Sequence, residues 1–583
     1  MKKYALRPEI PKNVDENLKE HNPLVRSLLY IRGIEDADNA YDFLNPNYEK
    51  HVHDPYLLKN MEKVVKRILK AIERNETIAI FSDYDADGIP GAVILHDFFQ
   101  KIGYKNFVNY IPLRNEEGFG LNDEAITTLH KVGVTLIVTI DCGISDVAQV
   151  EHANKHGIDV IITDHHTPPK KLPKAFTIIN PKQKGCDYPE KMLCGSGVIF
   201  KVIQALCGVL RDPLKIKNYK LKISATLPIG WEKWLLDMVG LATLSDIVPL
   251  LGENRVFSYY GLKVLQKSPR PGLLKLFSLL GMNQNTATED DIAFMITPRI
   301  NAASRMGIPR NAFNLLSTTD EVEAGVLAEH LNKINDQRKG VVGGMVKEIK
   351  KKIADRGEEM KHVLVFGNPE WKPSLLGLVA NSFSDEHNRP VFFWGRNSES
   401  GGLIKGSCRA GGDTDVVALM EKAKDAFVEY GGHKGAGGFS VLQENIHTLE
   451  DKLNEAFLEL QNVSKGTFDT LVDKKLSLDD VNWGIYNLVE KFAPFGFENP
   501  KPLFLLENIE ISGMKLFGKE QNHLELKFKN SSGKDVTAIA FFSTGDKFEI
   551  PVTVGSNMNL VATMEKSQFR NFPELRLRIV DIF

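Results

Sequence analysis

The chain has 583 residues, which is too long for one hydrophobic core and predicts three or four domains. Hydrophobic residues make up 43% of it and charged residues 25%, without low-complexity tracts, which excludes a fibrous or largely disordered protein. The formal net charge of −2 provides no general attraction to nucleic acid, so any nucleic-acid site would have to be a local basic patch.

The cysteines and the hydropathy pattern predict a soluble cytoplasmic protein. The five cysteines are scattered and form no C-x-x-C pair, as expected of reduced thiols in a cytosol. The first residues lack the apolar core of a signal peptide, and no apolar run approaches the ~18 residues of a membrane span.

Alternating patterns along the chain predict an α/β protein with a β domain at its end. Short β-branched runs alternate with helical stretches over residues 77–165 and again over 362–428, which predicts a parallel-sheet domain and a smaller α/β domain. Helical spacing over 318–355 predicts a long connecting helix, and several short strands after about residue 465 predict an OB-like barrel. A helical segment, residues 1–72, is predicted to pack on the first α/β domain, residues 73–317. The connecting helix (318–355), the second α/β domain (356–462) and the barrel (463–583) follow.

Three carboxylates follow the first predicted strand of the first sheet. The apolar run 77–82 is followed by Asp83, Asp85 and Asp87, and then by Gly88. Side chains two residues apart in an extended chain project to the same side, so these carboxylates can converge. In isolation they fit a solvated acidic turn or a helix cap equally well.

The next two strands end in similar residues. Residues 135–140 lead into Asp141, residues 158–163 lead into Asp164, His165 and His166, and a fourth acidic position, Asp246, follows a helical stretch. Each residue alone could be a cap, a turn or a polar core group. Ligands of parallel sheets bind beyond the carboxyl ends of the strands, so the set together predicts one site.

The type of ligand indicates the chemistry. A mixed set of carboxylates and imidazoles suits Mn²⁺ or Mg²⁺ better than Zn²⁺. Five or six candidate ligands leave room for two ions about 3.5–4 Å apart, which can activate a water and hold the oxygens of a phosphate. The residues therefore predict hydrolysis of a phosphoester or phosphoanhydride.

The motifs resemble those of the DHH phosphoesterase superfamily, and the glycine-rich stretch Gly431–Gly438 resembles the signature of its accessory DHHA1 domain. Within the superfamily the whole chain is similar to the RecJ family, bacterial 5′-to-3′ exonucleases specific for single-stranded DNA that act in DNA repair and recombination. The segments that carry the similarity are Arg32-Gly33, Phe43-Leu44, Asp83–Gly88, Arg114, Glu117–Leu121, Asp141–Gly143, Asp164–His166, Ser245-Asp246, Gly252–Arg255, Pro298–Arg305, Lys405–Arg409 and Pro494–Pro500.

The resemblance implies a role for each matching residue. The implied metal ligands are Asp85, Asp87, Asp141, His165 and Asp246, with Asp83 as a ligand or a supporting group. Asp141 would bridge the two ions, His166 would contact the attacking water or the phosphate, and His433 would face the scissile phosphate from the second domain. The implied substrate-binding residues are Arg114, Arg299, Arg305, Ser407, Arg409, Gly432 and Gly435.

Arginine suits a terminal phosphate because its guanidinium forms two parallel hydrogen bonds, and glycine lets backbone N–H groups approach a phosphate. Arg114, Ser407 and Arg409 would bind the 5′-phosphate, whereas Arg299 and Arg305 would line the path of the strand. The predicted barrel would add a DNA-binding surface from Lys527, Lys529, Phe541, Phe542, Arg576 and Arg578, although alternation alone makes the phenylalanines core residues.

Four positions depart from the family pattern. Cys142 replaces an asparagine, Pro90 replaces a small residue, and Lys372 and Ser374 stand where the family has histidine and glycine. The last change is expected to alter affinity or rate.

Two alternative functions remain open. One is another DHH phosphodiesterase, of the nanoRNase or cyclic-dinucleotide type, and the other is a non-catalytic replication scaffold of the eukaryotic branch. The RecJ resemblance implies single-stranded DNA as substrate, two Mn²⁺ or Mg²⁺ ions as cofactors, a monomer, and a single-stranded-DNA-binding protein and a RecQ-type helicase as partners.

Overall fold

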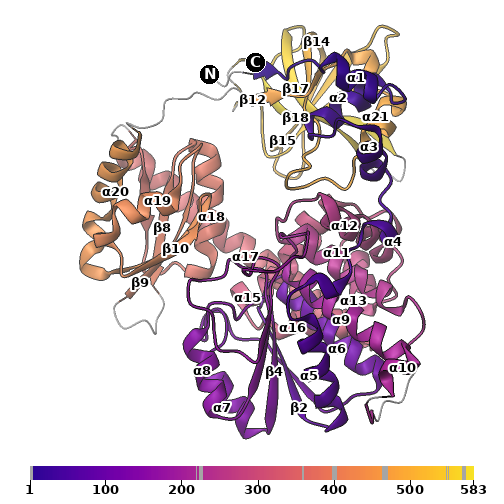
Figure 1. The fold of residues 1–583 in the computed structure, drawn as a ribbon. Coiled ribbons are helices and arrows are strands. Elements are labelled where there is room, and N and C mark those ends of the chain that lie inside the picture. Colours follow the sequence, from indigo (N-terminus) through magenta and orange to yellow (C-terminus); the bar gives the residue numbers. More distant parts are fainter. Residues whose placement is uncertain are drawn as a thin grey trace. The chain divides into compact units, whose positions relative to one another are not determined.

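The computed structural model describes residues 4–217, 219–221, 227–356, 360–396, 403–461, 470–546, 548, 550–567 and 573–583. The chain forms two compact units (Figure 1). The two-sheet unit consists of Asp54–Asp246 and Leu262–Gly466. The barrel unit combines three separate segments, Met1–His53, Ile247–Gly261 and Thr467–Phe583.

The first sheet of the two-sheet unit is parallel and five-stranded, in the order β3-β2-β4-β5-β6. Its strands are β2 (Thr77–Ser82), β3 (Phe107–Tyr110), β4 (Val134–Ile140), β5 (Asp159–Thr163) and β6 (Thr177–Ile179). β2 and β4 are almost fully buried, as expected of apolar strands covered on both faces. The predicted parallel sheet is confirmed, with β6 added at its edge.

Helices cover both faces of this sheet. On one side α7 (Asp123–Lys131) and α8 (Val147–Lys155) pack against β4 and β5, and on the other side lie α6 (Gly88–Ile102) and α9 (Gly195–Arg211) (Figure 1). The remaining helices of this part are α5 (Met61–Glu73), α10 (Pro213–Ile216), α11 (Leu236–Ser245), α13 (Pro271–Leu279), α14 (Glu289–Asp291), α15 (Thr297–Met306) and α16 (Arg310–Ser317).

A single long helix, α17 (Glu321–Arg356), follows, as the spacing over 318–355 predicts. Its buried stripe includes Ala324, Ala328, Leu331 and Met345. The helix packs against α13, α15 and α16 and also against α18 (Pro373–His387) of the second α/β region, so it connects the two sheets of this unit.

The second sheet is five-stranded and mixed, in the order β10-β11-β9-β8-β7. Only β7 and β8 pair in parallel, and the other neighbours are antiparallel. Its elements are β7 (Leu364–Gly367), β8 (Val391–Arg396), β9 (Leu403–Arg409), β10 (Glu429–His433), β11 (Ala436–Leu442), α18, α19 (Val416–Lys422) and α20 (Ile446–Gln461).

The barrel unit contains a closed, mainly antiparallel barrel. β14 pairs with both β15 and β17, and β18 joins β16 to β17, which closes the sheet. The strands are β12 (Thr470–Val472), β13 (Lys474–Lys475), β14 (Phe504–Phe517), β15 (His523–Lys529), β16 (Asp535–Ala540), β17 (Asn557–Ser567) and β18 (Glu574–Ile582), with α21 (Trp483–Glu490) before β14. Closure removes the exposed strand edges, as in the OB-like barrel that the sequence predicts.

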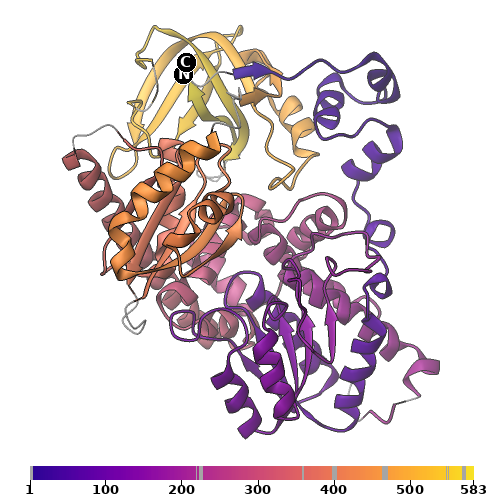
Figure 2. The ribbon, with the colours of Figure 1, turned by 60° about the vertical axis from the view of Figure 1, so that its left-hand side comes forward.

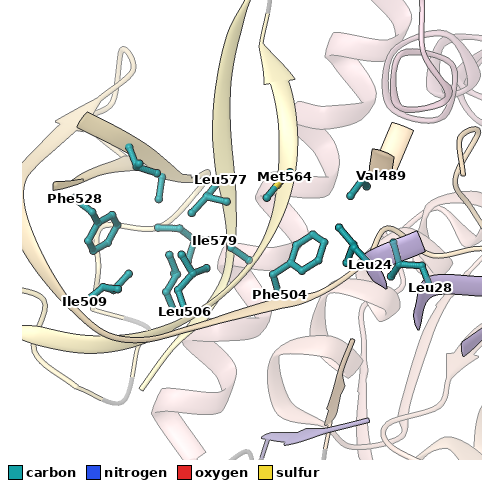
Figure 3. Close-up of a cluster of buried hydrophobic side chains, with 14 of the residues drawn as sticks. Leu24, Leu28, Val489, Phe504, Leu506, Ile509, Phe528, Met564, Leu577 and Ile579 are labelled. Carbon is teal, nitrogen blue, oxygen red and sulfur yellow. The ribbon is translucent and has the colours of Figure 1, made fainter. Parts of the chain in front are cut away.

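The N-terminal helices share the core of the barrel unit. They are α1 (Lys12–Asn17), α2 (Pro23–Ile31) and α3 (Ala37–Leu44), followed by α4 (Tyr48–His51). Leu24 and Leu28 on α2 belong to the same buried cluster as Phe504 and Leu506 on β14 (Figure 3). The prediction that this segment packs on the first α/β domain is wrong for α1 to α3, because their apolar faces are buried against α21 and the barrel.

Two further contacts tie distant parts of the barrel unit together. The short strand β1 (Tyr4–Leu6), drawn in blue beside the barrel in Figure 2, pairs in parallel with β12. The Tyr4 ring stacks on the Phe583 ring at a centroid distance of 5.1 Å. Arg255 on α12 (Gly252–Leu265) donates hydrogen bonds to the carbonyls of Phe43 and Phe492, each at 2.8 Å. These contacts are long-range in sequence and explain why three segments form one unit.

Within the described residues, no helix is both long enough and apolar enough to cross a membrane. The predicted domain boundaries at residues 72, 317, 355 and 462 stay predictions.

Candidate active site

The carboxyl ends of three neighbouring strands bring the predicted acidic residues to one edge of the first sheet. Asp83, Asp141 and Asp164 directly follow β2, β4 and β5. Each continues the parallel hydrogen-bond ladder by one step, because their backbone N–H groups donate to the carbonyls of the next strands at 3.0–3.1 Å. The shared edge therefore follows from strand register, as the sequence predicts.

His165 lies at the centre of the acidic cluster. Its Nε2 is 3.2 Å from Asp141 Oδ1, 3.5 Å from Asp246 Oδ2 and 3.8 Å from Asp87 Oδ2. Ligand atoms within 4.8 Å of one another form three overlapping groups: Asp83, Asp85 and Asp141; Asp141, His165 and His166; and Asp87, His165 and Asp246. The structure thus brings together every residue that the sequence predicts as a metal ligand.

The electrostatics of this cluster are those of a cation site. Burial, and then repulsion between neighbouring carboxylates, raises the pKa of Asp83, Asp141 and Asp246 well above the usual value. The same causes raise the pKa of Asp87 to about 6, and burial lowers the pKa of His165 to about 3.

Unpaired oxygens give the same indication. Among the described residues, Asp83 Oδ1, Asp141 Oδ1 and Asp246 Oδ2 are buried and accept no hydrogen bond. Buried polar atoms without partners are costly, and a divalent cation coordinated by oxygen would satisfy all three. The donor set, five carboxylates and imidazole nitrogen, therefore fits Mn²⁺ or Mg²⁺.

The acidic loop itself is held by short-range hydrogen bonds. Asp85 Oδ1 accepts from the backbone N–H groups of Asp87 and Gly88 at 2.8 and 3.2 Å. Gly88 is required at its position, since a Cβ there would lie 2.5 Å from the carbonyl oxygen of Asp83. Asn301 on α15 accepts from the N–H of Ala86 at 2.9 Å and fixes the top of the loop.

Asp87 is anchored at the N-terminus of α9. Its carboxylate accepts from the N–H of Gly195 at 2.5 Å and of Ser196 at 2.7 Å, and the Ser196 hydroxyl donates to its carbonyl at 2.6 Å. A Cβ on Gly195 would lie 2.5 Å from Asp141 Cβ, so only glycine fits here. The sequence alone does not identify Gly195 and Ser196, because a glycine-serine pair before a helix is common.

Asp164 is a positioning residue, which the sequence pattern places at the site without giving it a role. Its Oδ1 accepts from the backbone of His165 and His166 at 2.7 and 3.0 Å and from His166 Nδ1 at 2.8 Å, and its Oδ2 accepts from Ile144 N–H at 3.0 Å. Burial alone would lower the pKa of His166, but the bond to Asp164 and the nearby negative charges raise it. A buried aspartate immediately before two histidines is the signal that could have identified it.

A cluster of arginines forms a second part of the site. Arg114 stacks over the Tyr84 ring at 5.0 Å, and Arg305 Nη1 donates to the Ser374 carbonyl at 2.6 Å. Burial, and then the positive charges of Arg114, Arg338 and Arg409, lowers the pKa of Arg305 to about 9. Grouped cations of this kind favour an anionic ligand.

Arg409 is held in place by its neighbours. Its Nη1 donates to Ser407 Oγ at 3.1 Å, and its Nε donates to Asn381 Oδ1 at 2.8 Å. A Cβ on Gly377 would lie 2.8 Å from Arg409 Nη2 and 3.2 Å from Ser407 Oγ, so Gly377 leaves room for this pair. The sequence reasoning missed both Gly377 and Arg338, whose charge faces the cluster from α17.

Four predicted substrate-binding or catalytic residues are not part of these clusters. Arg299 donates to Asn332 Oδ1 at 3.0 Å and to the Met295 carbonyl at 2.6 Å, so its guanidinium holds α15 against α17. His433, Gly432 and Gly435 are exposed, and the described part of the chain shows no ion pair between His433 and the carboxylates. The glycine-rich stretch Gly431–Gly438 forms a hairpin, in which β10 ends at His433 and β11 begins at Ala436.

The barrel unit carries a separate group of aromatic and basic residues. Arg578 and Arg576 lie over the Phe541 ring at 4.1 and 5.6 Å, whereas Phe542 is 79% exposed. Lys527 and Lys529 both pair with Asp535, at 3.3 and 2.6 Å. Phe541 therefore has two guanidinium groups near its ring, whereas Phe542 is mostly exposed and contacts His523 edge-on at 4.9 Å.

Three family models match the chain, and their order agrees with the fold. The DHH family N-terminal domain matches residues 77–229, the DHHA1 domain matches 360–459, and the RecJ OB domain matches 472–581. They cover the first sheet, the second sheet and the barrel.

Curated relatives extend the similarity over almost the whole chain. The chain is 32% identical over 562 residues to a Bacillus subtilis protein named single-stranded-DNA-specific exonuclease RecJ, covering 96% of this chain and 68% of the relative. The Escherichia coli protein of the same name is 30% identical over 490 residues, or 83% of each chain.

Solved structures show the same fold. A crystal structure of RecJ from Thermus thermophilus in complex with Mn²⁺ superposes with a TM-score of 0.79 at 23% identity, covering all of this chain and 79% of that one. A crystal structure of exonuclease RecJ bound to manganese has a TM-score of 0.56 at 30% identity, covering 68% of this chain and 94% of that one. With the domain order, the shared motifs and this similarity taken together, the chain belongs to the RecJ family.

Proposed function

We propose that this protein is a metal-dependent exonuclease that hydrolyses single-stranded DNA from its 5′ end and releases nucleoside 5′-monophosphates. The observation that carries the proposal is the convergence of buried, unpaired carboxylate oxygens around His165 in a chain of the RecJ family. Its curated relatives are named single-stranded-DNA-specific exonucleases.

In this proposal the acidic cluster holds two divalent ions, Mn²⁺ or Mg²⁺. The ligands are Asp85, Asp87, Asp141, His165 and Asp246, with Asp141 shared and Asp83 as ligand or support. Such ions supply an activated water and neutralise the charge that builds up on the phosphate. Asp87 is aimed by Gly195 and Ser196, and His165 is neutral, as a metal ligand must be.

His166 acts on the substrate rather than on the fold. Asp164 occupies its Nδ1, which leaves Nε2 to contact the scissile phosphate. The bond to Asp164 keeps the ring oriented and favours its protonated form, so the imidazole can donate to a phosphate oxygen. His433 would reach the same phosphate from β10, with Gly432 and Gly435 as backbone donors.

The arginine cluster recognises the chain end. Arg114, Ser407 and Arg409 would bind the terminal 5′-phosphate, and Arg305 would line the path of the strand. A fixed phosphate pocket beside the acidic cluster defines how far the chain end extends past the reacting bond, and this gives the enzyme a direction. The barrel unit would hold more distant nucleotides, with Phe542 as a stacking surface.

The experiment that tests this function compares 5′-labelled and 3′-labelled single-stranded oligonucleotides in the presence of Mn²⁺ or Mg²⁺. We expect release of the 5′ label as mononucleotide first, no cleavage of duplex DNA, and no activity after chelation or in Asp141→Ala. Release from the 3′ end, or unchanged activity in Asp141→Ala, would contradict the proposal. Cleavage of dinucleotides or cyclic dinucleotides alone would support the other DHH activities.

We further propose a cytoplasmic location and recruitment by a single-stranded-DNA-binding protein or a RecQ-type helicase. Co-purification of either partner with the full chain is the measurement that checks the proposed recruitment.

A further inference from the structure

Three histidines form a cluster away from the acidic site. His130 lies in the last turn of α7, His152 lies in α8, and His156 follows α8 directly. Crossover helices of a parallel sheet run antiparallel to the strands, so helix C-termini lie at the edge opposite the carboxyl ends. The cluster is therefore at the other edge of the first sheet from the acidic residues.

The His156 ring lies next to each of the other two rings, at a spacing close to that of imidazoles on one ion. The His156 ring centroid is 4.7 Å from that of His130 and 4.7 Å from that of His152. Metal–nitrogen bonds of ~2.0–2.1 Å in tetrahedral geometry place imidazole centroids about 5 Å apart. The N–H of His156 donates to the carbonyl of His152 at 3.3 Å, so the pair lies one helical turn apart on one face.

The side chains are free to act as ligands. His130 is exposed, while His152 and His156 are half-buried. The one hydrogen bond that the structure gives their ring nitrogens is His152 Nε2 with Thr127 Oγ1, at a long 3.4 Å, within the described residues. Burial and the two neighbouring imidazoles lower the pKa of His156, which favours the neutral form that binds metal.

The ring nitrogens of the three histidines do not converge on one point in this structure. Among the described residues, groups of ligand atoms all within 4.8 Å of one another occur only at the acidic cluster, so the imidazoles must turn about their side-chain torsions. Rotations of exposed side chains such as His130 take picoseconds to nanoseconds.

We propose that His130, His152 and His156 form a second metal site that is independent of the acidic cluster. An all-imidazole set selects borderline divalent cations such as Zn²⁺, Ni²⁺ or Cu²⁺ over Mn²⁺ and Mg²⁺, which prefer oxygen. The bound ion would link α7 to α8, with its remaining position open to water.

The test is a calorimetric titration with Ni²⁺ of the full chain without a histidine tag. Millimolar Mg²⁺ is present throughout. We expect His130→Asn with His156→Asn to bind one Ni²⁺ fewer than the unchanged protein. His447→Asn, which removes an exposed histidine on α20, is the matched control and should bind the full number. Asp141→Ala should keep the histidine site, which separates this proposal from the proposed nuclease.

Two results would overturn the proposal. One is equal Ni²⁺ binding by the double variant and the unchanged protein, with both folded by circular dichroism. The other comes from electron paramagnetic resonance of Asp141→Ala loaded with one equivalent of Cu²⁺. The proposal is wrong if the nitrogen splitting of this spectrum stays the same when His130→Asn and His156→Asn are added.

Discussion

At the scale of single residues, the site depends on small side chains and backbone groups as much as on its charged residues. Gly195 and Gly88 allow carboxylates and backbone to approach within distances that a Cβ would forbid. Asp164 accepts four hydrogen bonds, which hold the backbone and the His166 ring in place. These residues fix where the ligands point, and electrostatic catalysis depends on such fixed positions.

Gly377→Ala tests the arginine cluster at the scale of one residue. The added Cβ would lie 2.8 Å from Arg409 Nη2 and displace the guanidinium from Ser407. We expect a loss of about tenfold, or ~1.4 kcal/mol, in kcat/KM on 5′-phosphorylated DNA and a smaller loss on 5′-hydroxyl DNA. Gly208→Ala on α9, where a Cβ meets nothing within 4 Å, is the control. Equal losses on both substrates would remove Gly377 and Arg409 from end recognition.

At the scale of elements, the sequence predicts most strands and helices but not every partner. The apolar runs of β2, β4 and β5 and the register of a parallel sheet are sufficient to place Asp83, Asp141 and Asp164 together. β10 and β11 escape prediction because four of the residues from Gly431 to Gly438 that pair in the hairpin are glycines, which carry no side-chain pattern. The Arg338 contribution is missed because the face that a long helix presents to a neighbour depends on tertiary packing.

The middle of α17 offers a prediction about helix stability. Gly340, Gly343 and Gly344 lie in its interior with negative φ, and a Cβ at each would meet nothing within 4 Å. Packing therefore does not require glycine, and each Gly→Ala change should raise the free energy of unfolding by about 1 kcal/mol. Chemical denaturation of the triple variant checks the sum. If activity on long DNA falls while stability rises, the glycines serve motion of the second sheet relative to the first.

At the scale of the whole molecule, one of the two compact units is built from three segments that are far apart in the sequence. The amphipathic pattern of α2 predicts that one face of the helix is buried, but it does not predict which residues cover that face. That surface comes from residues near the other end of the chain, through Phe492 and β14. Arg255 adds a third segment to the same unit by hydrogen bonds to four backbone carbonyls, those of Phe43, Lys491, Phe492 and Ala493. Only the folded structure shows this closure of the chain on itself.

Leu28→Ala tests this organisation. Leu28 is fully buried between α2 and the barrel, so its truncation should cost about 2–5 kcal/mol of unfolding free energy. Since α2 and the barrel share one core, hydrogen exchange should accelerate in β14 and β17 as well as in α2, and remain unchanged in β2 and β4. Tyr41→Ala on α3, where the ring is 65% exposed, is the matched control. Faster exchange confined to α2 would mean that the N-terminal helices only rest on the barrel and do not stabilise it.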